Sequence, residues 1–517
     1  MTFSFNLVDE KWIPCLWQDG RAEEMSLRET LANAHLLWDV HGATPLETAA
    51  LYRLLLVILH RAFGPANVAS WKALYSAGQC ERSKLEAYWK KWRHRFDHFD
   101  KDRPFYQADD RRVSPKSIIS LVLEMASGNN AALFDHHTET EGASLTSAEA
   151  ACAVLAAQAF GIGGLSGLPD KFTDAPCAKG IVFFAQGSSL FETLMFNLAK
   201  YPDDSGPMPS DEDDCPAWEM DDSFKPKRTQ PKGYLDYLTW QNRRILLLPE
   251  ESPAGVIVRQ MKWAPGLRLE GNEIDPMKRY LKDEKGEGWR VLQFDMARSL
   301  WRDSATLFTL NDPDHIKPPR AFRWLATLVR EGALPAERNL RFVALGMSKN
   351  QAKIEFLRAE TFPLPLDYLK ENDVVTRLGD ALDRAEKAAG WLRGATLELG
   401  REILEPHASA GKMKKEERER AGDFIAPWGI DSRYWSGLEL PFRRLLEGLP
   451  REPERAEAEW KATLRRAVEQ AFAQAVRYAG EDTRARKAAV TADRLLRHGL
   501  REVLGEPEFA SVKGGTA

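Results

Sequence analysis

The sequence predicts an α+β protein, in which a large mixed N-terminal domain, residues 1–365, is followed by a C-terminal four-helix bundle, residues 366–517. Its 517 residues exceed what one ordinary core holds, since domains average about 150 residues. Strand-like runs dominate from Tyr237 to Phe362, whereas long helical patterns follow Pro365. The domain boundary is therefore expected near residue 365.

The N-terminal part opens with a short strand-like segment, Phe3 to Val8. Leu- and Ala-rich stretches with apolar spacing near 3.6 then predict helices over Pro45 to Ala62 and Val68 to Arg95. Residues 202–233 are rich in Asp, Pro and Ser, which predicts an exposed loop or insertion.

The second half changes from strands to helices. The strand-like runs are RRILLLP, RVLQF, RFVALG and KIEFL, with one helix expected over Pro319 to Glu331. Beyond Pro365 the helical segments are 366–405, 413–425, 432–448 and 453–504, the last broken near Gly480.

Composition places the chain among soluble globular proteins, with 44% hydrophobic and 29% charged residues. A net charge of −4 argues against positive potential over the whole surface, so any nucleic-acid contact must be concentrated in patches or shared with partner subunits. No apolar run approaches the roughly 20 residues that span a bilayer, and the N-terminus lacks the apolar region of a signal peptide. We therefore expect a cytoplasmic protein without membrane contact.

The five cysteines are widely spaced and form no CxxC pair, which predicts neither a disulfide framework nor a zinc ribbon. They are Cys15, Cys80, Cys152, Cys177 and Cys215.

A polar hairpin is predicted at "GMSKNQAKIEF", residues 346–356, between strand-like Arg341 to Leu345 and Lys353 to Leu357. Tight hairpins usually turn on Asn-Gly, Asp-Gly or a similar pair. This one instead offers a narrow polar finger made of Ser348, Lys349, Asn350, Gln351 and Ala352.

A Gly-rich stretch, "FGIGGLSGLPD" at 160–170, matches neither the phosphate-binding loop nor GxGxxG. It follows a helix, Ala150 to Phe160, which a capping box of Thr146 and Glu149 opens, so that Gly161 is expected as a left-handed C-terminal residue. One cap needs fewer glycines than this stretch has, and the others would let the backbone approach a groove closely: Gly161, Gly163, Gly164 and Gly167.

The polar loop "SGNNAALFDHHTETEGASLTS", residues 127–147, surrounds the aromatic Phe134. This ring could stack on a base, bury in a partner, or pin the loop to its own domain. Asp135, His136 and His137 are adjacent, with no second cluster, and are weak evidence for a metal.

His94 and His98 stand four residues apart in a predicted helix, with Asp97 between them and Asp100 beyond. The Glu of HExxH is missing, which favours a solvated charged face, although a metal-dependent nuclease using these four residues stays open as an alternative. No GxSxG or Cys-His pattern indicates another catalytic centre.

Basic residues gather along one side of the final predicted helix, at spacings of three, four and seven. This basic stripe is either a solvated helix face or a track for a phosphate backbone, and it consists of Arg484, Lys487, Arg494, Arg497 and Arg501.

Five motifs together resemble the CasA family, the large subunit of the type I-E CRISPR surveillance complex called Cascade. They occur in the family's order along essentially the whole chain: "NLVDEKWIPC" (6–15), "RPFYQ" (103–107), "SGNNAALFDHH", "GIGGLSGL" and "KNQAKI".

The resemblance implies a recognition subunit without catalysis, cofactor or metal. Such a subunit checks the protospacer-adjacent motif (PAM) on double-stranded target DNA, starts unwinding beside it, and presents the DNA to a helicase-nuclease effector. Its other partners would be the subunits that carry the CRISPR RNA (crRNA), namely the backbone, small and 5′-handle-binding subunits. A purely structural scaffold remains a third possibility.

The resemblance also assigns residues. Gln351 matches the family's glutamine wedge, with Asn350 and Ala352 beside it. Gly161, Gly163 and Gly164 match its glycine loop, and Gly164 matches the PAM-contacting position. Phe134 matches the aromatic of a flexible loop, where His136 replaces the family's Asn. Lys262 in "RQMKWAP" is the candidate minor-groove lysine. The basic stripe would face the displaced DNA strand and the small subunit.

Overall fold

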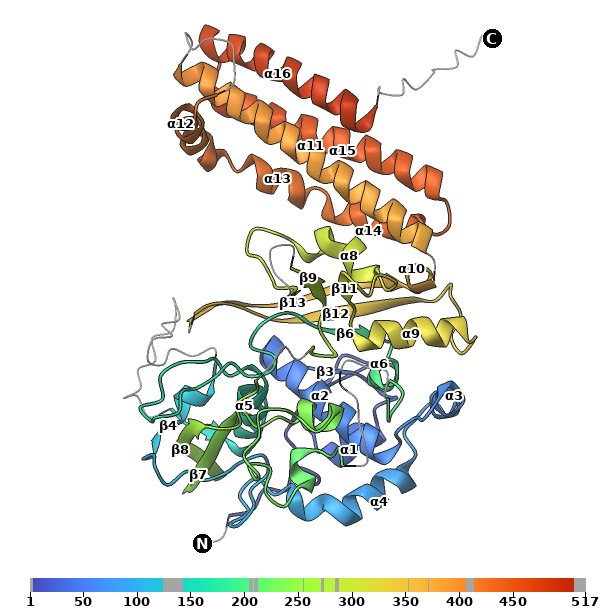
Figure 1. Ribbon diagram of the computed structural model, residues 1–517, viewed down its shortest axis with the longest axis vertical. Helices are drawn as coiled ribbons and strands as arrows, with labels where there is room; N and C mark the ends of the chain where they lie inside the picture. Colours follow the sequence, from blue (N-terminus) through green and yellow to red (C-terminus); the bar gives the residue numbers. More distant parts are fainter. Residues whose placement is uncertain are drawn as a thin grey trace. The chain divides into compact units, whose positions relative to one another are not determined.

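The computed structural model (Figure 1) describes residues 3–123, 143–203, 208, 213–253, 255–270, 274–283, 288–351, 353–370, 372–405 and 413–505. The chain divides into two compact units. The first comprises residues 1–300 and 309–370, and the second comprises residues 301–308 and 371–517. The predicted mixed class with a helical C-terminal region is confirmed. Segment 301–308, which the sequence left with the N-terminal domain, belongs to the second unit.

Helices of the first unit follow local signals closely. Helix α2 (Pro45–Ala62) has the predicted bounds, because Thr44 caps it and Pro45 fits its first turn. The helix predicted over 68–95 is wrong in its length. It is divided into α3 (Val68–Ser76), α4 (Arg82–Trp92) and the 3₁₀ turn η1 (Arg93–Arg95), with Gly78 at φ 71° in the first break. The remaining helices are α1 (Leu27–Ala32), α5 (Ser147–Phe160), α6 (Leu190–Asn197), α7 (Tyr234–Leu238), α9 (Arg320–Arg330) and α10 (Asp367–Lys370), with 3₁₀ turns η2 (Ile118–Leu121) and η3 (Ala217–Glu219).

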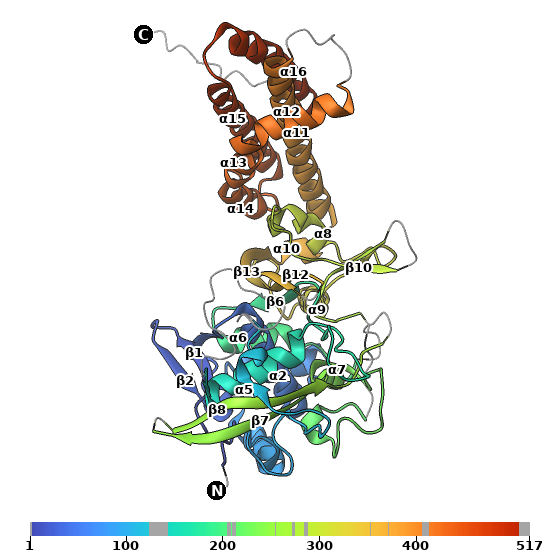
Figure 2. The same cartoon turned by 90° about the vertical axis from the view of Figure 1, so that its left-hand side faces the viewer.

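Small antiparallel sheets make up the rest of this unit. One has the order β2 (Ala22–Met25), β1 (Ile13–Trp17), β3 (Leu37–Val40), and another the order β10 (Trp289–Val291), β9 (Tyr280–Lys282), β11 (Ile316–Lys317). A third pairs the long strands β7 (Arg243–Ser252) and β8 (Gly255–Pro265), with β4 (Lys116–Ser117) and β5 (Leu145–Thr146) also on β8; Figure 2 shows β7 and β8 side by side. The strand predicted at Phe3 to Val8 is reduced to a single bridge between Asn6 and Asp97.

The fourth sheet carries the hairpin. Its order is β13 (Lys353–Pro365), β12 (Asn339–Asn350), β6 (Val182–Gln186). Phe183, Phe322 of α9 and Phe342 pack together, with ring centroids 5.7–6.2 Å apart. This aromatic packing holds the base of β12 in the core of the first unit.

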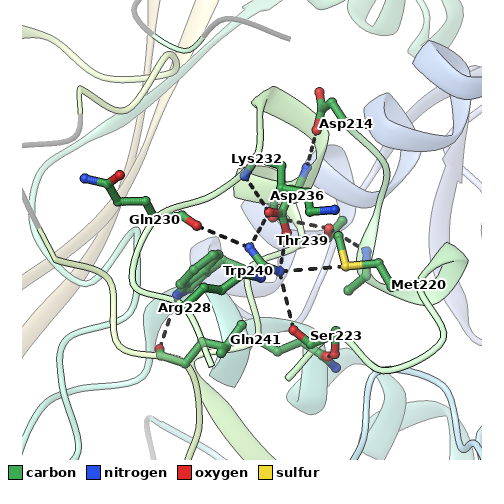
Figure 3. A network of polar contacts seen from close by, with 12 residues as sticks. Asp214, Met220, Ser223, Arg228, Gln230, Lys232, Asp236, Thr239, Trp240 and Gln241 are labelled. Atoms are coloured by element: carbon green, nitrogen blue, oxygen red, sulfur yellow. Dashed lines mark hydrogen bonds and ion pairs between the residues drawn. The ribbon is translucent and has the colours of Figure 1, made fainter. Parts of the chain in front are cut away.

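The described part of the acidic segment 202–233 is only partly the exposed loop that its composition predicts, since Asp221 and Asp222 are exposed but Asp214 is not. Asp214 is buried and accepts hydrogen bonds from the backbone N–H groups of Leu235 and Asp236, at 3.0–3.1 Å. Asp236 is also buried and pairs with Arg228, whose guanidinium lies over the Trp240 ring (Figure 3). Asp214 and Asp236 are therefore internal anchors, because hydrogen bonds and an ion pair inside the protein satisfy these two buried carboxylates.

The second unit is helical, as predicted. Its long helices are α11 (Asn372–Leu404), α15 (Pro453–Ala479) and α16 (Thr483–Leu504), and the break near Gly480 is confirmed, at φ 100°. The shorter ones are α8 (Ser304–Phe308), α12 (Lys415–Ile425), α13 (Ile430–Ser436) and α14 (Glu439–Gly448), with 3₁₀ turn η5 (Ala426–Trp428); a further turn, η4 (Leu300–Asp303), precedes α8. Trp301 stacks on Phe442 of α14 at 4.7 Å, which explains why its segment joins this unit.

Among the described residues, no helix has the length and apolar character needed to cross a bilayer.

Candidate nucleic-acid interface

The predicted finger is the end of a long hairpin (Figure 1). Strands β12 and β13 pair from Asn339 opposite Pro365 to Asn350 opposite Lys353. The strands run further toward the tip than the strand-like segments of the sequence, since β12 continues through Asn350, which pairs with Lys353. Gln351 is exposed at the tip, with φ 53°. Ala352 lies outside the described residues.

The outer part of the hairpin has less support than its base. Strand β6 pairs with β12 only from Arg341 to Leu345. Beyond this point β12 keeps β13 as its one strand partner in the described sheet, and its register shifts between Ser348 and Lys349. A two-stranded ribbon is marginal by itself in water, so the end of the hairpin needs another contact to stay in place.

The glycine loop begins at the end of α5, whose capping box of Thr146 and Glu149 is confirmed. Gly161 is not left-handed as predicted, because its φ is −52° and the chain leaves the helix extended. Close approach explains this glycine instead. A Cβ here would lie 2.6 Å from the Ala157 oxygen and 2.9 Å from an Arg243 guanidinium nitrogen.

Arg243 supports the glycine loop from the protein interior. This buried side chain donates to the carbonyl oxygens of Ile162, at 2.8 Å, and Thr173, at 2.9 Å. Its guanidinium also lies over the rings of Phe172 and Trp263. Burial lowers the pKa of Arg243 to about 9, which still leaves it charged at neutral pH.

Asp174 connects the glycine loop to the hairpin. Its carboxylate accepts the Gly163 N–H at 2.9 Å and the Lys349 ammonium at 2.7 and 2.8 Å. Lys179 adds a longer ion pair at 3.3 Å. Desolvation by burial opposes the charge on Asp174, but the hydrogen bonds from Lys349 and Gly163 outweigh it and lower the pKa of the carboxyl.

Gly164 is left facing solvent beside this junction. It exchanges two backbone hydrogen bonds with Phe172, both at 3.0 Å, and an added Cβ would meet no atom within 4 Å. Gly164 and Gln351 are both exposed, and the Asp174 contacts join the segments that carry them. The loop and the finger, predicted separately, are therefore joined to each other at Asp174.

Lys262 lies on β8, opposite Leu246 of β7. Its ammonium pairs with Asp109 at 2.7 Å, and its side chain is 22% exposed. The next residue, Trp263, packs against Phe172 with ring centroids 5.8 Å apart. Because side chains alternate along a strand, Lys262 points to the opposite face of β8 from Trp263. Strand β8 thus reaches the glycine loop through Trp263.

The five residues of the basic stripe are all exposed on α16. Arg497 pairs with Asp493 at 2.7 Å, and Arg484 donates to the Leu404 oxygen at 3.2 Å. They belong to the second unit, whereas the hairpin and the glycine loop belong to the first.

The His94 region does not have the geometry that the nuclease alternative needs. Helix α4 ends at Trp92, so His94 and His98 do not share a helix face. His98 is buried, which lowers its pKa to about 3, contrary to the solvated face expected. Asp97 accepts N–H groups of Phe5 and Phe99, each at 3.0 Å. Asp100 accepts the N–H of Asp102 at 2.9 Å and that of Arg103 at 2.7 Å.

Within the described ranges, no group of three or more His, Cys, Asp or Glu side chains is placed to hold a metal ion. Phe134 and His136 lie outside the described residues. The residues that the sequence did not single out are Asp174 and Arg243, and Lys349 was noticed only as part of the finger. A lone Asp or Arg has no local pattern that would have indicated these contacts.

Known proteins resemble this chain over nearly all its length. The sequence profile of CRISPR-associated protein Cse1 matches residues 6–471. A curated "CRISPR-associated protein CasA/Cse1" from Thermus thermophilus is 32% identical over 532 residues, covering 99% of this chain and 97% of that protein. A crystal structure of CasA from Thermus thermophilus has a TM-score of 0.81 at 28% identity, covering 97% of this chain and 100% of the other.

A chain of a solved CRISPR RNA-guided surveillance complex shares the fold, with a TM-score of 0.77 at 23% identity, covering 96% of this chain and 99% of that chain. These matches define the class, that of CRISPR-associated proteins. The chain belongs to the Cse1 family, also called CasA, which confirms the resemblance seen in its motifs.

Proposed function

We propose that this chain, as the large subunit of a type I-E Cascade complex, recognises the PAM in the minor groove of target DNA and wedges the duplex open beside it. The observation that carries the proposal is the junction at Asp174. By binding both Gly163 and Lys349, Asp174 links the segments that carry exposed Gly164 and exposed Gln351, which supports their acting together. A PAM reader and a wedge must act on neighbouring base pairs, so they need such a fixed relation.

The chemistry of this surface suits a minor groove. That groove is about 6 Å wide, and its A·T and G·C pairs differ mainly by one amino donor. A glycine backbone without a nearby side chain, as at Gly164, can approach base edges that a bulkier residue would not reach. Reading by so few groups cannot separate all four base pairs, which implies tolerance for several PAM sequences.

Gln351 would occupy the space of the first base pair beyond the PAM. Separating that pair costs a few kcal/mol of stacking and pairing, which pairing of the guide RNA with the released strand offsets. The end of the hairpin suits this role, since Asn350 pairs with Lys353 and Gln351 is exposed. Asn350, next to it at the end of β12, adds a second amide.

The same proposal gives the chain no catalytic step of its own. Its partners would be the crRNA-bearing Cascade subunits and the helicase-nuclease, and the exposed stripe on α16 would contact the displaced strand. Fold similarity to a chain of a surveillance complex supports the first of these partners. DNA cutting by the purified chain with Mg²⁺ or Mn²⁺ would contradict the non-catalytic part.

The test compares linear target duplex with a target already melted beside the PAM, using assembled complexes. Replacing Asn350 and Gln351 by Ala should slow opening of the linear duplex roughly tenfold, equivalent to about 1.4 kcal/mol, and spare the melted target. Gln79→Ala, at an exposed glutamine between α3 and α4, is the control. Equal loss on both substrates would count against a wedge. Binding without any PAM dependence would favour a scaffold.

A further inference from the structure

We propose that Lys349 does not contact DNA. Its ion pair with Asp174, called the strut below, holds the outer hairpin against the glycine loop. Lys349 and Asp174 are then positioning residues for the site described above. The inference rests on the proposed function for its DNA consequences, whereas the strut itself concerns only this chain.

The donors of Lys349 are all occupied. A lysine ammonium has three N–H groups. In the structure Nζ lies 2.7 and 2.8 Å from the two Asp174 oxygens and 3.3 Å from the Gln351 carbonyl oxygen. The Lys349 side chain is only 9% exposed. No donor is left for a phosphate, although a lysine beside two amides in a polar finger would usually be taken for a phosphate contact.

The strut acts beyond the part of the hairpin that pairs with β6. Strand β6 stops pairing at Leu345, so residues 346–350 of β12 extend beyond it. The register shifts between Ser348, which pairs with Phe356, and Lys349, which pairs with Ile354. Directly beyond this shift, Lys349 reaches Asp174, and its third contact restrains the carbonyl of Gln351 at the tip.

The other end of the strut is equally fixed. Asp174 Oδ1 accepts the Gly163 N–H, and a Cβ at Gly163 would come within 3.2 Å of the Asp174 nitrogen and the Phe172 oxygen. A side chain at position 163 would therefore displace Asp174, the residue that anchors Lys349. One carboxylate thus sets the relation of the PAM-reading loop to the wedge.

Hydrogen exchange tests the strut without DNA. In the full chain, Asp174→Asn and Lys349→Met should each speed amide exchange about tenfold or more, both in the loop around Gly163 and at the hairpin tip. Lys349→Met keeps the apolar stem and removes the ammonium, which covers the case that Asp174→Asn does not fold. Lys179→Ala is the matched control, because Lys179 also pairs with Asp174 but is 62% exposed and lies off the hairpin. Unchanged exchange in both variants would overturn the strut.

Salt dependence tests it with DNA. A lysine that neutralises a phosphate contributes about 0.9 to the slope of log affinity against log salt concentration. Lys349→Met should leave that slope unchanged for PAM-bearing duplex, while affinity falls roughly tenfold at every salt concentration. Discrimination against a wrong PAM should fall with it, and Asp174→Glu should restore part of it. A slope reduced by about 0.9 in Lys349→Met would overturn the strut.

The two sets of measurements separate the proposals. Faster exchange in Asp174→Asn and Lys349→Met without any change in DNA binding would support the strut and contradict the proposed PAM site.

Discussion

Gly163 and Gly164 are adjacent, yet adding one methyl group to each should affect the free energy of unfolding differently. At Gly164 the new Cβ meets no protein atom within 4 Å, and its φ is outside the left-handed region, so alanine fits. We expect Gly164→Ala to leave the free energy of unfolding within about 0.5 kcal/mol of the parent. At Gly163 the Cβ comes within 3.2–3.3 Å of Asp174 and Phe172 atoms. Gly163→Ala should therefore cost about 1–2 kcal/mol.

DNA binding should rank the two variants differently. If a base edge approaches the Gly164 backbone, a methyl group there displaces it and costs about 1–2 kcal/mol, or roughly 5- to 30-fold in affinity. Gly164→Asp should lose more, because it also places a carboxylate near phosphates. The assays are urea unfolding of the chain and PAM-duplex affinity of the assembled complex at fixed salt. A loss of affinity in Gly164→Ala, with unfolding unchanged, can come only from something outside the protein.

The refuting result is equally direct. If complexes with Gly164→Ala and Gly164→Asp bind PAM duplex as the parent does, Gly164 is not at the interface. Gly390→Ala, at a helical glycine of α11 that also has no atom within 4 Å of an added Cβ, controls for the substitution itself.

Three further predictions concern other parts of the chain. Gly499→Ala should destabilise it by about 1–3 kcal/mol, because a Cβ would lie 2.0 Å from Trp391, whereas Gly390→Ala should be stabilising by about 0.5–1 kcal/mol; urea unfolding measures both. Partial burial of Glu192 opposes its negative charge, but hydrogen bonds from Ser188, Arg338 and Tyr75 outweigh this effect and lower its pKa to about 2. The ionised carboxylate contributes about 1–2 kcal/mol to stability after solvent screening. This contribution is present above the ordinary pKa of 4.5 and is lost as pH falls through about 2. In Glu192→Gln, the free energy of unfolding should therefore fall less steeply as the solution is acidified. Replacing Lys487 by Ala should lower the salt slope of DNA binding by about 0.9 if the stripe follows a phosphate backbone, and not at all if it is a solvated face.

Local signals explain which parts of the fold could be predicted from the sequence. The capping box of Thr146 and Glu149, the bounds of α2 and the break at Gly480 all depend on residues within a few positions of one another. Part of the acidic segment was misjudged for the opposite reason. The composition around Asp214 predicts a loop, yet its carboxylate accepts hydrogen bonds from the backbone N–H groups of residues 235 and 236. No local pattern indicates a partner so distant in the chain.

The residues of the candidate site also divide into those with a local sequence signal and those without one. Gln351 and Gly164 stand out because a polar turn and a glycine cluster are visible in a few letters. Asp174 and Arg243 do not, since their importance lies in which distant backbone groups they reach. Lys349 was seen as part of the finger, but only its distance to Asp174 shows that its charge is already satisfied.

The position of Lys349, two residues before the tip, has a mechanical consequence. A hairpin that separates a base pair costing a few kcal/mol must itself resist bending by a comparable amount. The base of the hairpin meets this demand through β6 and through Arg338, which pairs with Glu192 at 2.5 Å. Closer to the tip, Lys349 has the Asp174 contact in addition to its pairing with β13. Placing the lysine at 349 rather than at 351 anchors the ribbon close to its end and leaves an uncharged amide at the tip, where the proposed wedge would enter the DNA.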